Sequence, residues 1–103
     1  MLRYVSAKLY LTPMAGAATI IYKTKKDETI KLIALGFNRD SESEARLRIE
    51  DEELVRVFSD TEFGYGDFIP LGFEVPPDTE IEVVCKDLDE SDDPAYFTLL
   101  YEV

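Results

Sequence analysis

The chain has 103 residues, of which 46% are hydrophobic and 32% charged, and its formal net charge at pH 7 is −11. This length and composition predict one domain, residues 1–103, folded around its own hydrophobic core rather than a disordered chain. The acidic balance argues against nucleic acid as a partner, because binding to phosphates depends on clustered lysine and arginine.

Hydrophobic residues recur at every second position along most of the chain, which is typical of strands with one buried and one solvated face. In the segment EARLRIE, Ala45, Leu47 and Ile49 alternate with Arg46 and Arg48. The predicted strands, in chain order, are 2–12, 17–25, 29–37, 44–50, 54–58, 70–75, 79–87 and 95–102.

Turn-forming and polar residues separate these strands. They include Pro13 to Gly16, a polar loop at 38–43, a hairpin turn at Asp51-Glu52, and Pro76-Pro77-Asp78. One segment, 50–57, could instead form one or two turns of helix. Eight short strands at even spacing predict an all-β fold, an antiparallel β-sandwich of about eight strands that is jelly-roll-like, with an up-and-down barrel as the second possibility.

The residue types that are missing exclude several kinds of chemistry. The chain has no histidine, so a Ser-His or Cys-His catalytic pair is excluded and the commonest ligand of zinc and iron is absent. Cys85 is the only cysteine, which excludes an internal disulfide, and its apolar neighbours Val83 and Val84 predict a buried core residue. Paired carboxylates carry little specificity among 22 acidic residues. We expect no cofactor, no metal and no enzymatic activity.

The sequence gives little indication of location. No stretch is long and apolar enough to cross a bilayer as a helix. Residues 2–11, followed by small residues, loosely resemble a secretory leader, but Lys8 interrupts the apolar region, so we expect neither a cleaved leader nor a membrane contact. The absence of glutamine and the single asparagine, Asn38, are features of heat-adapted proteins.

An aromatic segment next to two glycines is the first candidate site. In FGYGDF, Phe63, Tyr65 and Phe68 flank Gly64 and Gly66 in a predicted connection of about eleven residues. Some of these rings could fold back to close one end of the sandwich, because a loop of this length must bury something to stay ordered. Alternatively they form a contact surface, a role that suits tyrosine.

A charged pattern is the second candidate. Arg46 and Arg48 point outward from one predicted strand, and Glu80 and Glu82 from another. If these strands lie on different sides of the domain, neighbouring copies could join basic to acidic faces in a ring or lattice. Alternatively the four side chains pair across adjacent strands of one sheet.

The acidic run at 87–93 is a third candidate. Its carboxylates could coordinate calcium, but the EF-hand pattern fails because Asp92 occupies its glycine position and Thr98 its bidentate glutamate position. The alternative, which we favour, is a solvated hairpin loop between the last two strands.

In outline, residues 66–103 resemble the closing strands of small jelly-roll modules in virion proteins. The resemblance lies in GDFIPLGFEVPPDTEIEVVCKD and AYFTLLYEV, and the preceding TIKLIALGFNRDSESEARLRIED resembles their central hairpin. It implies a structural role in an oligomeric particle, such as capsid decoration, tail or spike, and it carries over no functional residues. We therefore expect a non-enzymatic module that self-associates or attaches to a larger assembly, with Phe63, Tyr65, Phe68, Arg46 and Arg48 as contacts. The alternative is a carbohydrate-binding module.

Overall fold

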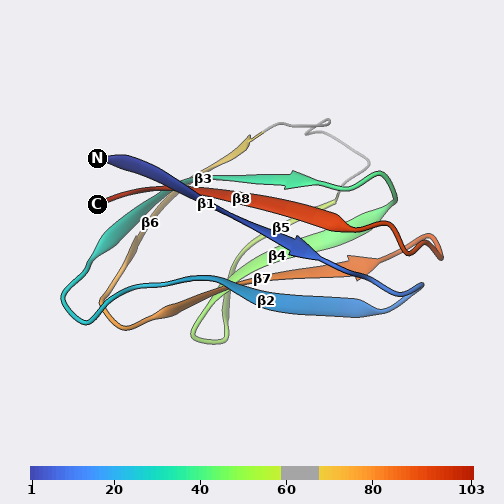
Figure 1. Cartoon of the computed structure of the whole chain (residues 1–103), viewed down its shortest axis with the longest axis horizontal. Coiled ribbons are helices and arrows are strands. Elements are labelled where there is room, and N and C mark those ends of the chain that lie inside the picture. Colours follow the sequence, from blue (N-terminus) through green and yellow to red (C-terminus); the bar gives the residue numbers. More distant parts are fainter. Residues whose placement is uncertain (59–67) are drawn as a thin grey trace.

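The computed structural model describes residues 1–58 and 68–103. In this part of the chain eight antiparallel strands form two four-stranded sheets (Figure 1). The strands are β1 (Leu2–Leu9), β2 (Gly16–Lys23), β3 (Ile30–Asn38), β4 (Ser43–Ile49), β5 (Glu52–Phe58), β6 (Phe68–Val75), β7 (Glu80–Asp87) and β8 (Ala95–Glu102). Sheet A has the order β1-β8-β3-β6, and sheet B has the order β2-β7-β4-β5.

This strand order is that of a jelly roll. The pairs β1·β8, β2·β7, β3·β6 and β4·β5 are those of one long hairpin folded back on itself. Rolling that hairpin brings β3 beside β8 and β4 beside β7, which closes the two sheets. The predicted all-β, jelly-roll-like sandwich is confirmed.

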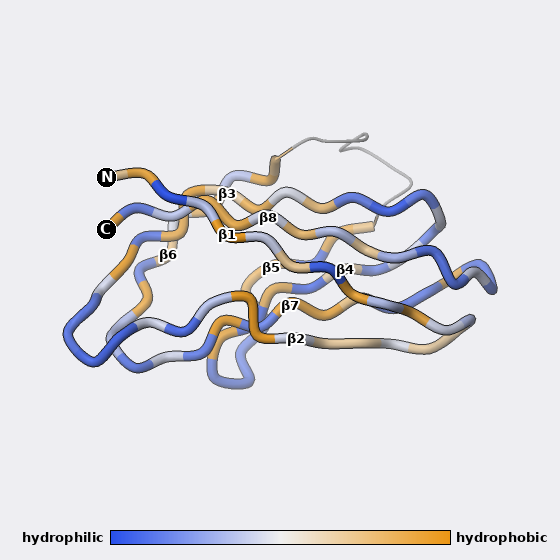
Figure 2. Tube along the Cα trace, viewed as in Figure 1, coloured by the Kyte–Doolittle hydropathy of each residue, from blue (hydrophilic) through white to orange (hydrophobic). Residues whose placement is uncertain are grey.

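Alternation places the hydrophobic core between the sheets. Its largest fully buried side chains include Phe97 and Leu99 from sheet A and Leu47 and Ile81 from sheet B. Hydrophobic colour follows the strands and hydrophilic colour gathers at the turns (Figure 2). Cys85 is also fully buried, as predicted, and burial raises the pKa of its thiol.

The helical alternative for 50–57 is wrong. β5 pairs with β4 through this segment, with Leu47 opposite Val55. Glu50 and Asp51 form the two-residue turn, one position earlier than predicted, and both have positive φ angles of 50° and 66°. Positive φ at both central residues is what a tight hairpin turn requires.

β6 begins at Phe68, two residues earlier than the predicted start at residue 70. Phe68 pairs with Gly36 on β3, so it belongs to a sheet and not to a loop. Phe63 and Tyr65 lie outside the described residues. Within the described residues there is no helix long and apolar enough to span a bilayer.

Candidate interaction surfaces

The outer face of sheet A carries two adjacent rows of uncharged residues. The strand registers align Tyr4 with Leu100, Leu100 with Ala34, and Ala34 with Pro70. The next row places Ser6, Thr98, Gly36 and Phe68 side by side in the same strand order. We call these eight residues the uncharged face: Tyr4, Ser6, Ala34, Gly36, Phe68, Pro70, Thr98 and Leu100.

Contacts and exposure place this face on the outside of sheet A, although Ala34 and Gly36 are themselves buried. The hydroxyls of Ser6 and Thr98 are 3.1 Å apart and share a hydrogen bond. Tyr4 is 73% exposed and Phe68 45% exposed. A Cβ atom at Gly36 would lie 2.9 Å from Cε1 of Phe68, so only glycine at this position lets the Phe68 ring rest on the sheet. The Phe68 ring therefore covers the outside of sheet A and does not fill the core.

Charged residues border the uncharged face. At one end Lys31 of β3 lies opposite Glu102 of β8. At the other end the Nζ atom of Lys8 is 4.9 Å from the centre of the Tyr10 ring and 5.4 Å from that of Tyr96. Hydrogen bonds that Lys8 donates to the hydroxyls of Tyr10 and Tyr96 raise the pKa of Lys8, so the face has a positive border here.

Beside Lys8 the surface forms a shallow hollow of about 300 Å³. The residues that line it are Ser6, Ala7, Lys8, Tyr96, Phe97 and Thr98. Of its two aromatic residues only Tyr96 is exposed, since Phe97 is part of the core. The hollow thus offers one ring and a few hydroxyls rather than a set of stacked aromatic platforms.

The outer face of sheet B carries charged residues, and its arginines form ion pairs. Arg46 and Arg48 of β4 lie there, as predicted. Arg48 contacts Glu82 of the adjacent strand β7 at 3.6 Å, and Arg46 contacts Glu44 at 3.5 Å and Glu53 at 3.8 Å. The strands that carry the arginines and glutamates are neighbours in one sheet. The arrangement on opposite sides of the domain is therefore wrong, and pairing across adjacent strands is confirmed for Arg48 and Glu82.

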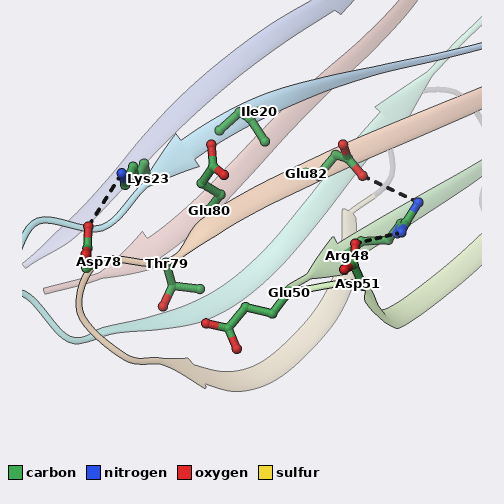
Figure 3. Close-up of a pocket in the computed structure, with 9 residues that line it drawn as sticks. All are labelled: Ile20, Lys23, Arg48, Glu50, Asp51, Asp78, Thr79, Glu80 and Glu82. Carbon is green, nitrogen blue, oxygen red and sulfur yellow. Dashed lines mark hydrogen bonds and ion pairs between the residues drawn. The ribbon is translucent and has the colours of Figure 1, made fainter.

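A hollow of about 340 Å³ opens on this charged face (Figure 3). It is lined by Ile20, Lys23, Arg48, Glu50, Asp51, Asp78, Thr79, Glu80 and Glu82. Its acidic groups face water, since the side chain of Asp51 is 99% exposed and that of Asp78 64% exposed. Ion pairs from Lys23 to Asp78 and from Arg48 to Asp51 cross its rim. It lacks the water-excluding wall that a catalytic pair of carboxylates needs.

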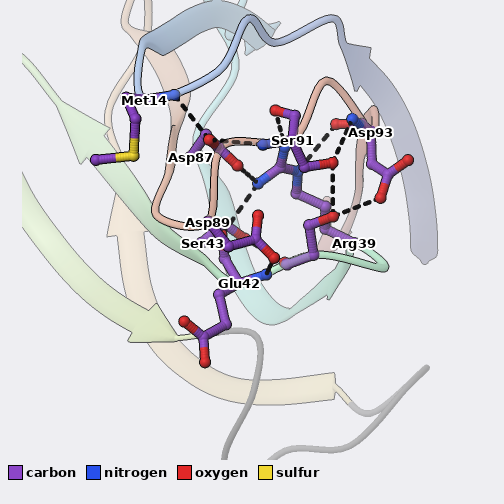
Figure 4. Close-up of polar contacts among 9 residues, drawn as sticks. Met14, Arg39, Glu42, Ser43, Asp87, Asp89, Ser91 and Asp93 are labelled. Carbon is purple, nitrogen blue, oxygen red and sulfur yellow. Dashed lines mark hydrogen bonds and ion pairs between the residues drawn. The ribbon is translucent and has the colours of Figure 1, made fainter.

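At the end of the sandwich where the acidic run lies, one buried ion pair joins three connections (Figure 4). Nη1 of Arg39 donates to Oδ1 of Asp87 at 2.7 Å, and neither side chain is exposed. The Arg39 guanidinium also donates to the backbone carbonyls of Glu42, Ser91 and Asp93. Arg39 thereby ties the β3–β4 connection to the β7–β8 connection.

The other oxygen of Asp87 binds the backbone. Its Oδ2 accepts from the N–H of Met14 at 2.7 Å and from that of Ser91 at 3.1 Å. Burial by itself would raise the pKa of Asp87, but these hydrogen bonds and the Arg39 cation outweigh it and lower the pKa. Asp87 is thus a buried anion that accepts three hydrogen bonds.

The 87–93 run is therefore a hairpin loop, as favoured, except that its first residue is buried rather than solvated. Other members of the run also hold the loop, since Asp93 accepts a hydrogen bond from Ser41 and Asp89 accepts one from the N–H of Glu42. In the described residues no group of three or more acidic or cysteine side chains is placed to hold a metal ion.

No protein-family model matches the sequence, and no curated protein matches it. Solved structures do match the fold. A chain from the acid-stable capsid of Helicobacter pylori bacteriophage KHP30 superimposes with a TM-score of 0.62 at 9% identity, covering 100% of this chain and 94% of that one. A chain from the Bacillus endospore appendages, a family of disulfide-linked pili, superimposes with a TM-score of 0.50 at 11% identity, covering 98% and 84%.

These similarities confirm the fold. At such low identity they do not assign a role to any residue. They agree with the resemblance to small β-rich structural modules that the sequence indicates.

The five predicted contact residues do not form one site. Phe68 lies on sheet A, whereas Arg46 and Arg48 lie on sheet B. The sequence analysis missed Tyr4, Tyr96 and Leu100. A signal for them existed, because β8 reads AYFTLLYE, and Tyr96, Thr98 and Leu100, between its buried positions, are also uncharged. A strand that is uncharged on both faces indicates a second contact surface.

Proposed function

We propose that this protein is a non-enzymatic structural module that self-associates or attaches to a larger particle such as a virion. The observation that supports this most directly is the uncharged face of sheet A. In a chain that is 32% charged, eight neighbouring outward positions without a charge are unusual. Contiguous apolar patches on a soluble protein mark contact sites.

The neighbours in structure support the same role. One belongs to a phage capsid and the other to a pilus, and both are repetitive assemblies. A compact jelly roll suits this role because it offers two broad sheet faces whose side chains can change without disturbing the core.

The carbohydrate-binding alternative has less support. Sugar recognition uses exposed rings around a concavity, and the hollow beside Lys8 has a single exposed ring, Tyr96. The charged hollow on sheet B is lined by no aromatic residue.

The proposal is tested by measuring the mass of the purified protein with multi-angle light scattering over a wide concentration range. We expect the mean mass to rise with concentration from that of the monomer toward twice that value or more. Because the uncharged face carries the contact, we expect the dissociation constant to change by less than about threefold between ~0.05 and ~0.5 M NaCl. A monomer at every concentration would refute self-association. A tenfold or greater weakening by salt would assign the contact to charged residues instead.

A further inference from the structure

On the uncharged face, large side chains of one copy can pack against small side chains of a second copy. Consider a two-fold axis that runs parallel to the strands between β8 and β3, with a second copy of sheet A facing the first. Such an axis places β8 over β3 of the second copy, and β1 over β6. Each row of the face then meets the same row of the other copy in reversed strand order.

In the first row this reversal brings large side chains to small ones. Leu100 lies over Ala34 of the second copy, and Tyr4 lies over Pro70. Tyr4 is 73% exposed and has an apolar ring that can cover a proline ring. Each of these contacts occurs twice because of the symmetry.

The second row follows the same rule. Phe68 meets Ser6 of the second copy, and Thr98 lies over the position of Gly36, which the Phe68 ring of the second copy covers. The Phe68 ring already rests over Gly36 of its own chain, so it lies against the sheet at this position. Alternation of large and small residues lets two sheets approach to the roughly 10 Å spacing of packed sheets.

Opposite charges at the border of the face also lie opposite each other in this arrangement. At the border of the face the axis brings Lys31 over Glu102 of the second copy, and Glu102 over Lys31. In the described residues neither side chain takes part in an ion pair within its own chain. Opposite charges would therefore meet at the rim, where water still reaches them, while the centre of the contact holds no charge.

The size of the face sets the strength of the contact. Together with its two charged borders, the face spans four strands at a spacing of ~4.8 Å and about eight residues at ~3.4 Å, which is roughly 500 Å² per copy, or roughly 1,000 Å² for two. Specific interfaces begin at about this area. The contact suits a reversible dimer that gains strength when many copies assemble, and not an obligate dimer.

Sheet B offers no comparable contact. Its outer face carries the paired arginines and glutamates, and taking these ion pairs out of water costs more than the attraction between them returns. The same reversal about its central strands would place Arg46 of β4 over Val84 of β7.

We infer that two copies of this chain pack face to face through the uncharged faces of sheet A, about a two-fold axis parallel to the strands between β8 and β3. This inference rests on the proposed assembly function and names the surface that carries it. The partner that the surface fits is a second copy of the chain.

The test compares two aspartate substitutions by sedimentation equilibrium of the full chain. Leu100→Asp places a charge on the outer face of β8 in sheet A. Ile20→Asp is the control, because Ile20 is an aliphatic residue of β2 in sheet B that is 41% exposed and lies opposite Glu82. We expect Leu100→Asp to raise the dissociation constant at least about 30-fold, since two charges are buried per dimer. Ile20→Asp should leave the constant within about threefold.

Further variants test the surface at a position that the fold does not need, and test the orientation of the two-fold axis. Tyr4→Arg alters an exposed side chain that the fold does not need, and it should also weaken the dimer at least about tenfold. Lys31→Glu should weaken the dimer, and the double variant Lys31→Glu with Glu102→Lys should restore it, because the opposite charges then meet again. Circular dichroism confirms that each variant is folded.

The outcomes separate this inference from the proposed function. If the wild-type chain associates but Leu100→Asp and Tyr4→Arg associate equally well, the surface is wrong while self-association stands. If the wild-type chain is a monomer throughout, self-association itself is refuted. If the double variant stays as weak as Lys31→Glu, the proposed axis is wrong.

Discussion

The outer faces of the two sheets differ in charge. Sheet B presents arginine and glutamate side chains that pair with one another, as Arg48 does with Glu82. Sheet A presents two rows without a charge, built from aromatic and small residues such as Tyr4 and Gly36. Both faces cover the same core, so the core does not explain the difference. On the proposed function, sheet B remains in water and sheet A is covered by a second copy.

A third environment extends the comparison, because Arg39 and Asp87 form an ion pair inside the molecule. On sheet B water screens the charged side chains, so each ion pair contributes little to the free energy of unfolding. The side chains of Arg39 and Asp87 are fully buried. Each charge is therefore stabilised by the other and by backbone groups, and not by solvent. The same residue types should therefore respond very differently to substitution.

The largest effect should follow Arg39→Met. The substitution keeps most of the apolar stem but leaves Asp87 as a buried anion without its cation, and three backbone carbonyls lose a donor. We expect the melting temperature to fall by roughly 10–20 °C, measured by thermal denaturation followed with circular dichroism. Adding Asp87→Asn should recover part of the loss, because the stranded charge is removed. A change of only a few degrees would show that the network does not hold the three connections together.

The contribution of Asp87 to stability should depend on pH in a defined direction. The pKa of Asp87 is lower in the folded chain than its ordinary value, so its contribution to stability is present above the unfolded pKa, about 3.9. That contribution is lost as pH falls toward the lower folded pKa.

The measurement is urea unfolding of the wild type and Asp87→Asn between pH 2 and pH 7. The difference in unfolding free energy should be constant from about pH 5 to 7. It should shrink below about pH 4, because Asp87 of the unfolded wild-type chain then takes up a proton while the folded chain still holds it as an anion. Comparing two proteins at each pH largely cancels the repulsion that the net charge of −11 produces. A difference that grows as pH falls would contradict the direction of the shift.

Much of the fold could be predicted from the sequence because alternation depends only on neighbouring residues. Strands such as β4 and β7 have a buried residue at every second position, and the pattern appears directly in the letters. The boundary errors, at Phe68 and at the Glu50-Asp51 turn, arose where backbone conformation and not hydrophobicity decides.

The surfaces were harder to predict because they depend on which strands become neighbours. Tyr4 and Leu100 are 96 positions apart in the chain and adjacent in sheet A. Arg39 and Asp87 form their ion pair across a separation of 48 residues. Nothing in the local sequence of NRDS or CKDL identifies these partners. Once the jelly-roll order is known, the register alone brings them together.

The smallest effect should follow Arg48→Met on the outer face of sheet B. Arg48 contacts Glu82 at 3.6 Å and Asp51 at 3.4 Å, but the Asp51 side chain is almost fully exposed. Water and salt already screen these charges, so removing them should lower the unfolding free energy by less than about 1 kcal/mol. Urea unfolding at neutral pH measures the change, with Arg39→Met as the matched substitution inside the molecule.

The same variant should leave the dissociation constant of any assembly within about threefold, because sheet B is expected to stay in water when copies meet. A large loss of association would instead place Arg48 in a contact between copies and would assign the interface to the charged face. A loss of stability as large as that of Arg39→Met would mean that ion pairs on sheet B hold the sandwich together. Either result would remove the distinction between a face built for water and a face built for contact.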